Sequence, residues 1–251
     1  MEVHHHSHSS RKKWTHYFWE FFMLFLAVTL GFFVENQREH YVEHLREKQY
    51  ARSLYTNLKS DTVWIRRTIA EKTWVLEKAD SLIKILSSPG EITNNNELIY
   101  YFERFMRRRN IFTGNDLTYR QLINSGNFRY FKNLGLNSKI ANYYIMYDRY
   151  HAIGESEYGK IGELTQLESI LFNGGDLTSL TNPDAGTFYE NFKRPDTKFQ
   201  PVNTDPQVRN SFQIKVGIYH YAISRSRALL IRLDDFGAEA IEEIKKEYHF
   251  E

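Results

Sequence analysis

The chain has 251 residues, with 33 basic and 31 acidic side chains and a formal net charge of +2 at pH 7. This near balance argues against a nucleic-acid partner held by bulk electrostatics, which requires concentrated positive charge. Cysteine is absent, which excludes disulfides, thiolate metal sites and cysteine nucleophiles and leaves the redox compartment open.

The N-terminal part of the chain is predicted to be a tail followed by a membrane anchor. Residues 1–13 are rich in histidine and basic residues, and we expect them to be disordered. Residues 14–34 form an almost unbroken apolar run of roughly the 20 residues that a helix needs to cross a bilayer. Polar residues from Glu35 onward follow directly, without the small residues of a signal-peptide cleavage site, so we expect the anchor to be retained.

The charges that flank the apolar run predict its direction. Basic residues near the run are equal in number on its two sides, but Arg11, Lys12 and Lys13 are consecutive, whereas those that follow the run alternate with glutamates. The positive-inside rule therefore favours a cytoplasmic N-terminus. We expect a single-pass protein of a bacterial inner membrane, with its large C-terminal domain in the periplasm.

Glu20 lies inside the apolar run. An ionisable side chain within a span is by default a candidate for function, either through a contact with another transmembrane helix or through proton or ion handling. Glu20 also lies near the headgroup edge and four residues after His16, so snorkelling or a local pair is a simpler structural interpretation. All of these interpretations stay open.

A long helix is predicted to follow the span, because no proline or glycine occurs from Glu35 to about Leu86. Residues 35–50 are mostly polar and are expected to form a stalk. Beyond them, polar residues at Asp61, Thr68 and Lys72 interrupt a coiled-coil-like seam, which favours packing against other helices of this chain. The seam consists of Ala51, Leu54, Leu58, Ile65, Val75, Ala79, Leu82 and Leu86.

Residues 51–251 are expected to form one helical-bundle domain. Two helices come first, one from near residue 93 to Arg109 and a short one at 116–124 that carries Leu117, Leu122 and Ile123. They are followed by a long helix at about 138–172, an irregular loop at 173–205 and a last helix from Pro206 that Gly237 breaks or bends. The apolar stripes of the two long helices are Ile140, Tyr143, Tyr147, Tyr150, Ile161, Leu164 and Leu171, and Phe212, Val216, Tyr219, Ile223, Leu230 and Leu233.

The predicted fold is therefore all-α. An N-terminal transmembrane helix continues into a long amphipathic helix, and this helix packs in an antiparallel helical bundle.

Two stretches of the sequence carry a family likeness. The first is Tyr17-Phe18-Trp19-Glu20-Phe21-Phe22, in a run that ends in Val34-Glu35-Asn36-Gln37, and the second is Leu117-Thr118-Tyr119-Arg120-Gln121-Leu122-Ile123-Asn124-Ser125-Gly126-Asn127, followed by Tyr143-Tyr144. They resemble a family of short bacterial single-span membrane proteins known only as a domain of unknown function. The likeness departs from the family pattern at Thr181 to Asp205 and at Phe128 to Phe131. It implies an anchor, its orientation and a helical fold, and it implies no activity.

A possible zinc site lies just beyond the span. His40, Glu43 and His44 match the H-x-x-E-H pattern, in which two histidines one helical turn apart bind zinc and the glutamate activates water. The string lies on a polar stalk with no flanking apolar pocket and no third ligand, which favours an ordinary exposed histidine pair over a metal-dependent hydrolase.

A second group of metal-ligating residue types, Asp148, His151 and Glu155, shares one face of the long helix. A di-metal bundle needs a matching motif on another helix, and the sequence has none, so a surface network is favoured.

Two further sets of residues are candidates for binding. Arg107, Arg108 and Arg109 could bind phosphate or an acidic partner, although cations at a helix C-terminus are also favoured by the helix dipole. The second set, Tyr143, Tyr147 and Tyr150, could line a ligand pocket, although core packing with hydroxyls at the rim is the alternative.

The sequence favours a membrane-anchored helical interaction or scaffold module, without catalytic activity or a cofactor. Its expected partners are the lipid bilayer and either another protein or a second copy of the chain. The alternative is an extracytoplasmic ligand sensor that acts through a partner, because the cytoplasmic tail is too short for an output domain.

Overall fold

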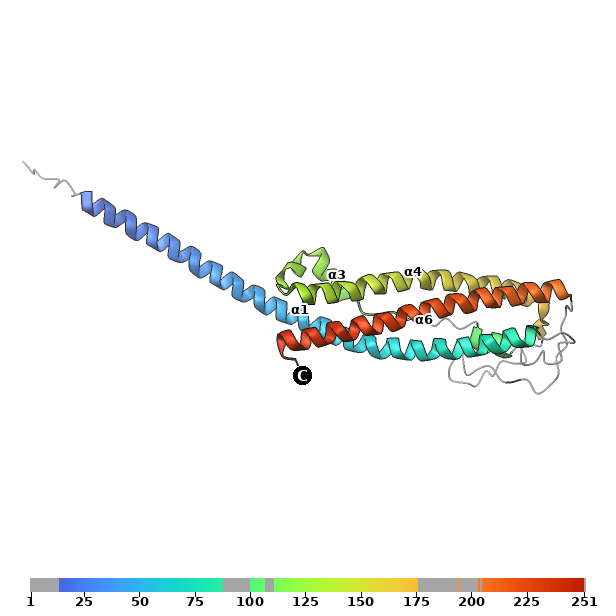
Figure 1. The fold of residues 1–251 in the computed structure, drawn as a ribbon. Coiled ribbons are helices and arrows are strands. Elements are labelled where there is room, and N and C mark those ends of the chain that lie inside the picture. The colour runs from blue at the N-terminus through green and yellow to red at the C-terminus, as the bar shows by residue number, and fades with distance from the viewer. Residues whose placement is uncertain are drawn as a thin grey trace, which may run out of the picture. The chain divides into compact units, whose positions relative to one another are not determined.

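The regular structure is entirely helical in the part of the chain that the computed structural model describes, namely residues 14–87, 100–106, 111–175, 194, 203 and 205–250. No strand occurs among these residues, so the predicted all-α class is confirmed. The elements in chain order are α1 (Trp14–Ser87), η1 (Phe102–Met106), α3 (Leu117–Asn124), η2 (Asn127–Tyr130), α4 (Leu134–Leu171) and α6 (Pro206–Tyr248) (Figure 1).

Two compact units divide the chain, residues 1–50 and residues 51–251. The described part of the first unit, residues 14–50, is the beginning of α1. Every side chain from 14 to 34 is exposed, and aromatic rings stack one turn apart, Phe18 on Phe22 and Phe21 on Phe25. Among the described helices, α1 is long and apolar enough to cross a membrane.

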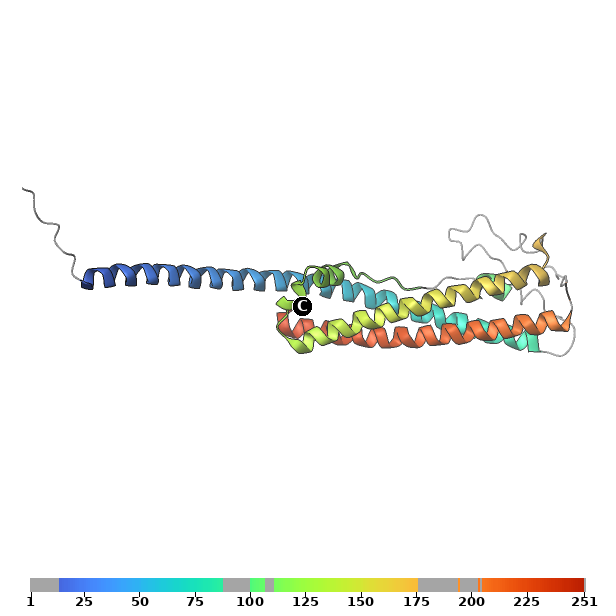
Figure 2. The same ribbon diagram turned by 90° about the horizontal axis from the view of Figure 1, so that it is seen from above.

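The second unit has its core where the remainder of α1, α4 and α6 lie side by side (Figures 1 and 2). All eight predicted seam residues of α1 are buried, from Ala51 to Leu86, which confirms the helical period and the face. The stripes predicted for the other two long helices are buried as well. Tyr143, Tyr150, Tyr219, Phe102 and Phe212 are among the largest fully buried side chains, so aromatic rings fill much of this core.

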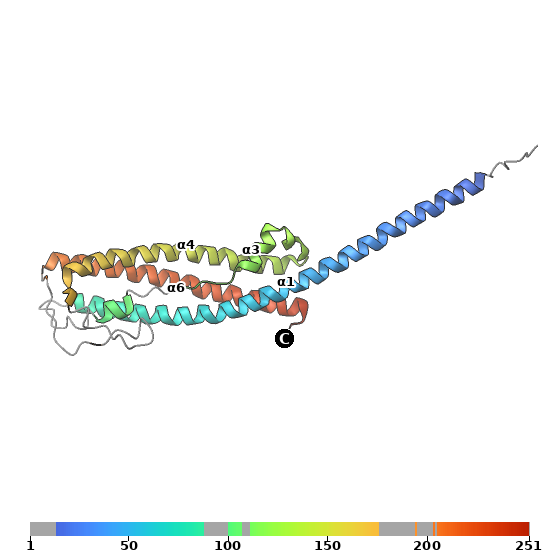
Figure 3. The ribbon, with the colours of Figure 1, turned by 180° about the vertical axis from the view of Figure 1, so that it is seen from behind.

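The contacts between helices fix their directions. Asp61 and Lys72 of α1 bond to Tyr143 and Glu157 of α4, so the two helices run in the same direction. Contacts to α6 run the other way. Residues in order along α1 bond to α6 residues in reverse order, Arg66 to Asp234, Thr73 to Arg227 and Asp80 to His220. In the view from behind, α6 passes between α4 and α1 in the middle of the bundle (Figure 3).

Local sequence rules set the helix ends. Asp205 accepts a hydrogen bond from the backbone N–H of Gln207 at 2.8 Å, and Pro206 occupies the first helical turn, as predicted. Gly126 has a φ of 68°, in the left-handed region that suits glycine. The predicted start of the third long helix near residue 138 is too late, because the Asn133 side chain caps a helix that begins at Leu134.

The apolar residues of α3 differ in exposure, because Leu122 is buried whereas Leu117 and Ile123 are exposed. Gly237 does not break the last helix, since α6 continues through it to Tyr248. A Cβ at Gly237 would lie 3.0 Å from the Cγ2 atom of Thr62, so the glycine allows α1 and α6 to approach closely. The predicted helix stop at residues 88–90 and most of the loop at 173–205 lie outside the described residues.

Candidate functional site

A buried ionic cluster joins the three long helices at mid-length. The Nζ of Lys72 on α1 donates to both carboxylate oxygens of Glu157 on α4, at 2.7 and 2.9 Å. The hydroxyl of Ser226 on α6 donates to the same carboxylate at 2.6 Å. We call these three residues, which are at most 3% exposed, the core triad.

The surroundings of the core triad are apolar, and burial therefore lowers the pKa of Lys72, while the Glu157 carboxylate opposes this shift. Tyr219 lies close enough to Glu157 for the carboxylate to add to the effect of burial, which raises the pKa of the tyrosine well above its usual value. The hydroxyl of Tyr219 is buried and has no hydrogen-bond partner within the described residues.

A second buried polar group is centred on Asp61 of α1. Its carboxylate accepts hydrogen bonds from the hydroxyl of Tyr143 at 3.0 Å and from the backbone N–H of Asn115 at 3.0 Å. Burial raises the pKa of Asp61, and both hydrogen bonds oppose this change. Asp61 therefore fastens α1 both to α4 and to the segment that precedes α3.

The tyrosines of α4 hold that same segment. The hydroxyl of Tyr147 accepts from the backbone N–H of Gly114 at 3.1 Å, and that of Tyr150 accepts from the N–H of Phe112 at 3.0 Å. A Cβ at Gly114 would lie 2.9 Å from Asp61 Oδ2, so glycine is needed for this close approach. Tyr143, Tyr147 and Tyr150, which the sequence offered as pocket residues, are buried and use their hydroxyls in these bonds.

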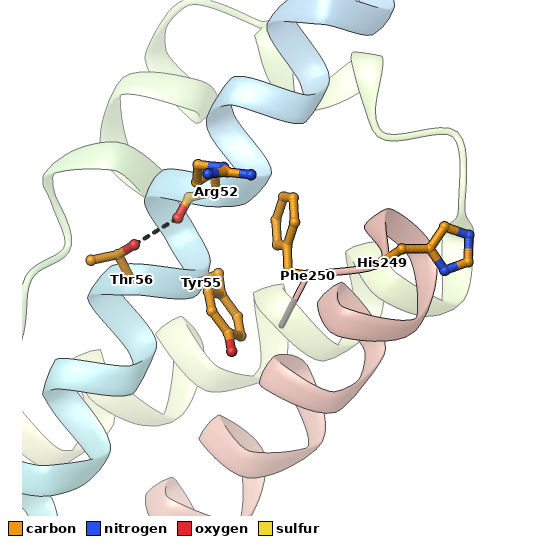
Figure 4. Close-up of a pocket in the computed structure, with 5 residues that line it drawn as sticks. All are labelled: Arg52, Tyr55, Thr56, His249 and Phe250. Atoms are coloured by element: carbon orange, nitrogen blue, oxygen red, sulfur yellow. Dashed lines mark hydrogen bonds between the residues drawn. The ribbon is translucent and has the colours of Figure 1, made fainter.

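An open groove of about 450 Å³ lies at the end of α6, lined by Arg52, Tyr55, Thr56, His249 and Phe250. The Phe250 ring lies between the side chains of Arg52 and Tyr55, and His249 points away from them (Figure 4). The Arg52 guanidinium is 5.0 Å from the centre of the Phe250 ring, within the range of a cation–π contact. The groove thus combines a cation with aromatic surface.

The ionisable candidates in and after the apolar run, Glu20 and the H-x-x-E-H string, lie close to side chains one turn away on α1. The Nε2 atom of His16 is 3.4 Å from Glu20, one turn along α1. His40 lies 3.6 Å from Glu43, and His44 lies 3.4 Å from Glu47, so each histidine of the H-x-x-E-H string faces a glutamate three residues later.

The second suggested metal face lies beside the tyrosines of α4. Asp148 accepts from Arg120 at 3.4 Å, and the His151 ring packs edge-on against Tyr147 at 4.5 Å. The Nε2 atom of His151 is buried without a hydrogen-bond partner in the described structure. No group of three or more His, Asp or Glu side chains in the described ranges is placed to hold a metal ion. Arg107, Arg108 and Arg109 lie outside these ranges.

Glu157 and Ser226 are functional residues that the sequence alone did not single out. A sequence signal for both residues exists, however, because each occupies a position that continues the apolar stripe of its helix. The predicted stripe of α4 has a gap between Tyr150 and Ile161, and that of α6 has a gap between Ile223 and Leu230. Each gap holds one polar residue of the core triad, and Lys72 interrupts the α1 seam in the same way.

These arrangements define a helical protein with two buried polar connections and an open cationic, aromatic groove. Comparisons of the sequence with models of known families, with curated proteins and with solved structures found no significant match. The resemblance to single-span membrane proteins of unknown function therefore stays a prediction.

Proposed function

We propose that the chain is a single-pass membrane protein that displays a helical interaction or scaffold domain in the periplasm. Residues 14–34 cross the bacterial inner membrane with the N-terminus in the cytoplasm, and residues 51–251 form a bundle in which α6 is the antiparallel neighbour of α1 and α4. The proposal includes no catalytic activity and no cofactor.

One observation carries this proposal. The same helix, α1, presents an exposed and mostly apolar surface from 14 to 34 and then a buried heptad row from Ala51 to Leu86. Exposed Phe, Leu and Trp over about 20 residues are costly in water and favourable in a bilayer. A helix that serves both the membrane and a folded core is what a membrane-displayed domain requires.

Topology is tested with reporters fused after residue 251. An alkaline phosphatase fusion, which is active only outside the cytoplasm, is expected to be active, and a fluorescent-protein fusion that requires the cytoplasm is expected to be dark. Replacing Arg11, Lys12 and Lys13 by Gln is expected to weaken the difference, because these residues carry the positive-inside bias. The opposite reporter pattern would overturn the orientation.

The interaction role is tested by crosslinking in native membranes followed by mass spectrometry. We expect reproducible crosslinks from residues 51–251 to one protein or to a second copy of the chain. The matched control keeps residues 35–251 and replaces residues 14–34 with an unrelated span. Crosslinks that persist in this control assign the contact to the domain, and crosslinks that vanish assign it to the span and to Glu20. No reproducible crosslink in either chain would contradict the proposal.

An extracytoplasmic ligand sensor is the second candidate, and the groove beside Phe250 is the observation that favours it. A guanidinium and two aromatic rings suit a small ligand with an anionic group and a flat apolar part. Native mass spectrometry of the protein released from membranes is expected to show an added mass, which Arg52→Gln should remove. An unliganded mass in both proteins would argue against the sensor.

A further inference from the structure

Each member of the core triad lies in the middle of a heptad series of core residues. The series on α1 is Leu58, Ile65, Lys72, Ala79 and Leu86; the series on α4 is Tyr143, Tyr150, Glu157, Leu164 and Leu171; and the series on α6 is Phe212, Tyr219, Ser226, Leu233 and Ala240. The other twelve residues are aliphatic or aromatic. The core triad is therefore the one polar position in each of the three series, and it is charged in the series of α1 and α4.

Apolar heptad packing alone does not distinguish registers well. A slide of one helix by seven residues again places apolar side chains opposite apolar side chains, since hydrophobic contacts are non-directional. Charged and polar residues at such positions are known to fix register, because a wrong register leaves them without a partner.

A slide in this bundle would separate the ion pair. Moving α4 by one heptad places Tyr150 or Leu164 opposite Lys72, and neither side chain is an anion. The ammonium of Lys72, which is 1% exposed, would then be buried with no counter-charge. Ser226 would keep a bond to the carbonyl of Ile223, which lies 3.3 Å from its hydroxyl, so the cost falls on Lys72 and Glu157.

We propose that the core triad locks the axial register of α1 against α4 and α6. The bundle then has one arrangement along its axis, and an axial displacement of α1 carries the other two helices with it. This inference concerns residues 51–251 alone and does not depend on the proposed membrane function.

Other buried contacts also favour the observed register, and two of them lie near one end of the bundle. One is the bond between Asp61 and Tyr143, and the other is the close approach of Gly237 to Thr62. A test must therefore change the core triad while leaving both contacts intact.

Spin-label distances can report the register of the full chain in detergent micelles. Because the chain has no cysteine, one cysteine per helix gives a clean labelling site. Ser60 on α1, Ser156 on α4 and Ser224 on α6 are exposed and suit the substitutions Ser60→Cys, Ser156→Cys and Ser224→Cys, used in pairs. A slide of one heptad moves a helix by about 10 Å along its axis, which pulsed electron spin resonance resolves.

With the core triad intact, each pair is expected to give one distance. In the variant Lys72→Met with Glu157→Leu, we expect a second distance displaced by about 10 Å in the pairs that include α1. The matched control is Lys139→Met with Glu243→Leu, which removes a partly exposed ion pair between α4 and α6 and should keep one distance. A single unchanged distance in the Lys72→Met, Glu157→Leu variant would overturn the proposal.

A second set of variants covers loss of folding, which circular dichroism would reveal as lost helicity. Lys72→Glu places two carboxylates together and should give the second distance. Adding Glu157→Lys restores a pair of opposite charges in the original register and should return the single distance. Two distances in the repaired variant, or one distance in Lys72→Glu alone, would equally overturn the register lock.

Discussion

Lys72 on α1 and Glu157 on α4 are 85 residues apart in sequence, and their charged groups lie 2.7 Å apart in the protein core. A buried ion pair contributes little net stability when compared with well-packed apolar residues, because desolvation offsets the attraction. Removing only one of the two residues is expected to lower stability much more, because the other charge is then buried without a partner.

Lys72→Met is expected to destabilise residues 51–251 by about 3–5 kcal/mol. The double variant with Glu157→Leu should recover most of this loss, because no buried charge remains. Chemical unfolding in micelles, followed by circular dichroism, measures both. The control Arg66→Met removes an exposed pair with Asp234 and should cost about 0–1 kcal/mol. Equal costs for Lys72→Met and Arg66→Met would contradict the assignment of Lys72 as a buried charge.

Gly114→Ala is expected to destabilise the same unit by about 1–3 kcal/mol. Its Cβ would lie 2.9 Å from both Asp61 Oδ2 and Phe112 Cζ, and 3.1 Å from a ring carbon of Tyr147. The control is Gly162→Ala on α4, where a Cβ meets nothing within 4 Å. This control should stabilise the helix by about 0.5–1 kcal/mol. Thermal unfolding of the two variants side by side checks the difference in sign.

Gly237→Ala distinguishes a packing glycine from a helix breaker. If the glycine merely weakened α6, alanine would stabilise it. We expect destabilisation instead, because the new Cβ meets Thr62 at 3.0 Å and Tyr143 at 3.3 Å. Gly217→Ala lies on the same helix in open space and serves as the control. The idea fails if both alanine variants raise the unfolding midpoint.

The stability of the unit is expected to fall as the pH drops below about 6.5, the ordinary pKa of histidine. Burial lowers the pKa of His151 in the folded protein, and although Asp116, Asp148 and Glu155 oppose this shift and Arg120 adds to it, the net direction is downward. The unfolded chain therefore binds the proton first, so stability is complete above the unfolded pKa and is lost as the pH falls toward the folded one.

The variant His151→Gln tests this pH dependence, since glutamine cannot titrate. Unfolding free energies at pH 7.5 and pH 5 should differ less in the variant than in the natural chain. An identical difference in the two proteins would assign the pH dependence to other groups.

The periodicity of apolar residues in the sequence was sufficient to predict the buried faces of the three long helices, α1, α4 and α6. The spacing of apolar residues from Ala51 to Leu86 depends only on the turn of an α-helix, so the buried face of α1 could be derived without knowing its neighbours. The same holds for the stripes of α4 and α6, for the cap at Asp205 and for the left-handed Gly126, because each depends on residues close in the chain.

The partners of buried polar groups could not be derived in this way. Lys72 is visible in the sequence as an interruption of a seam, but Glu157, which it contacts, lies 85 residues later in the chain. Ser226, which bonds to Glu157, lies further on still. The residues around one of these positions do not predict the other two. The role of Gly237 and the exposure of Leu117 and Ile123 also depend on what lies across the interface.

The sequence by itself determined that this protein has an exposed apolar helix joined to a helical domain with aromatic cores, since hydrophobicity and helical period are local properties. Only the tertiary structure decided that α1 and α4 run in the same direction, that the tyrosine hydroxyls hold residues 112–114, and that three polar residues meet at mid-bundle. These features depend on contacts between distant segments, where burial forces each polar group to find a specific partner.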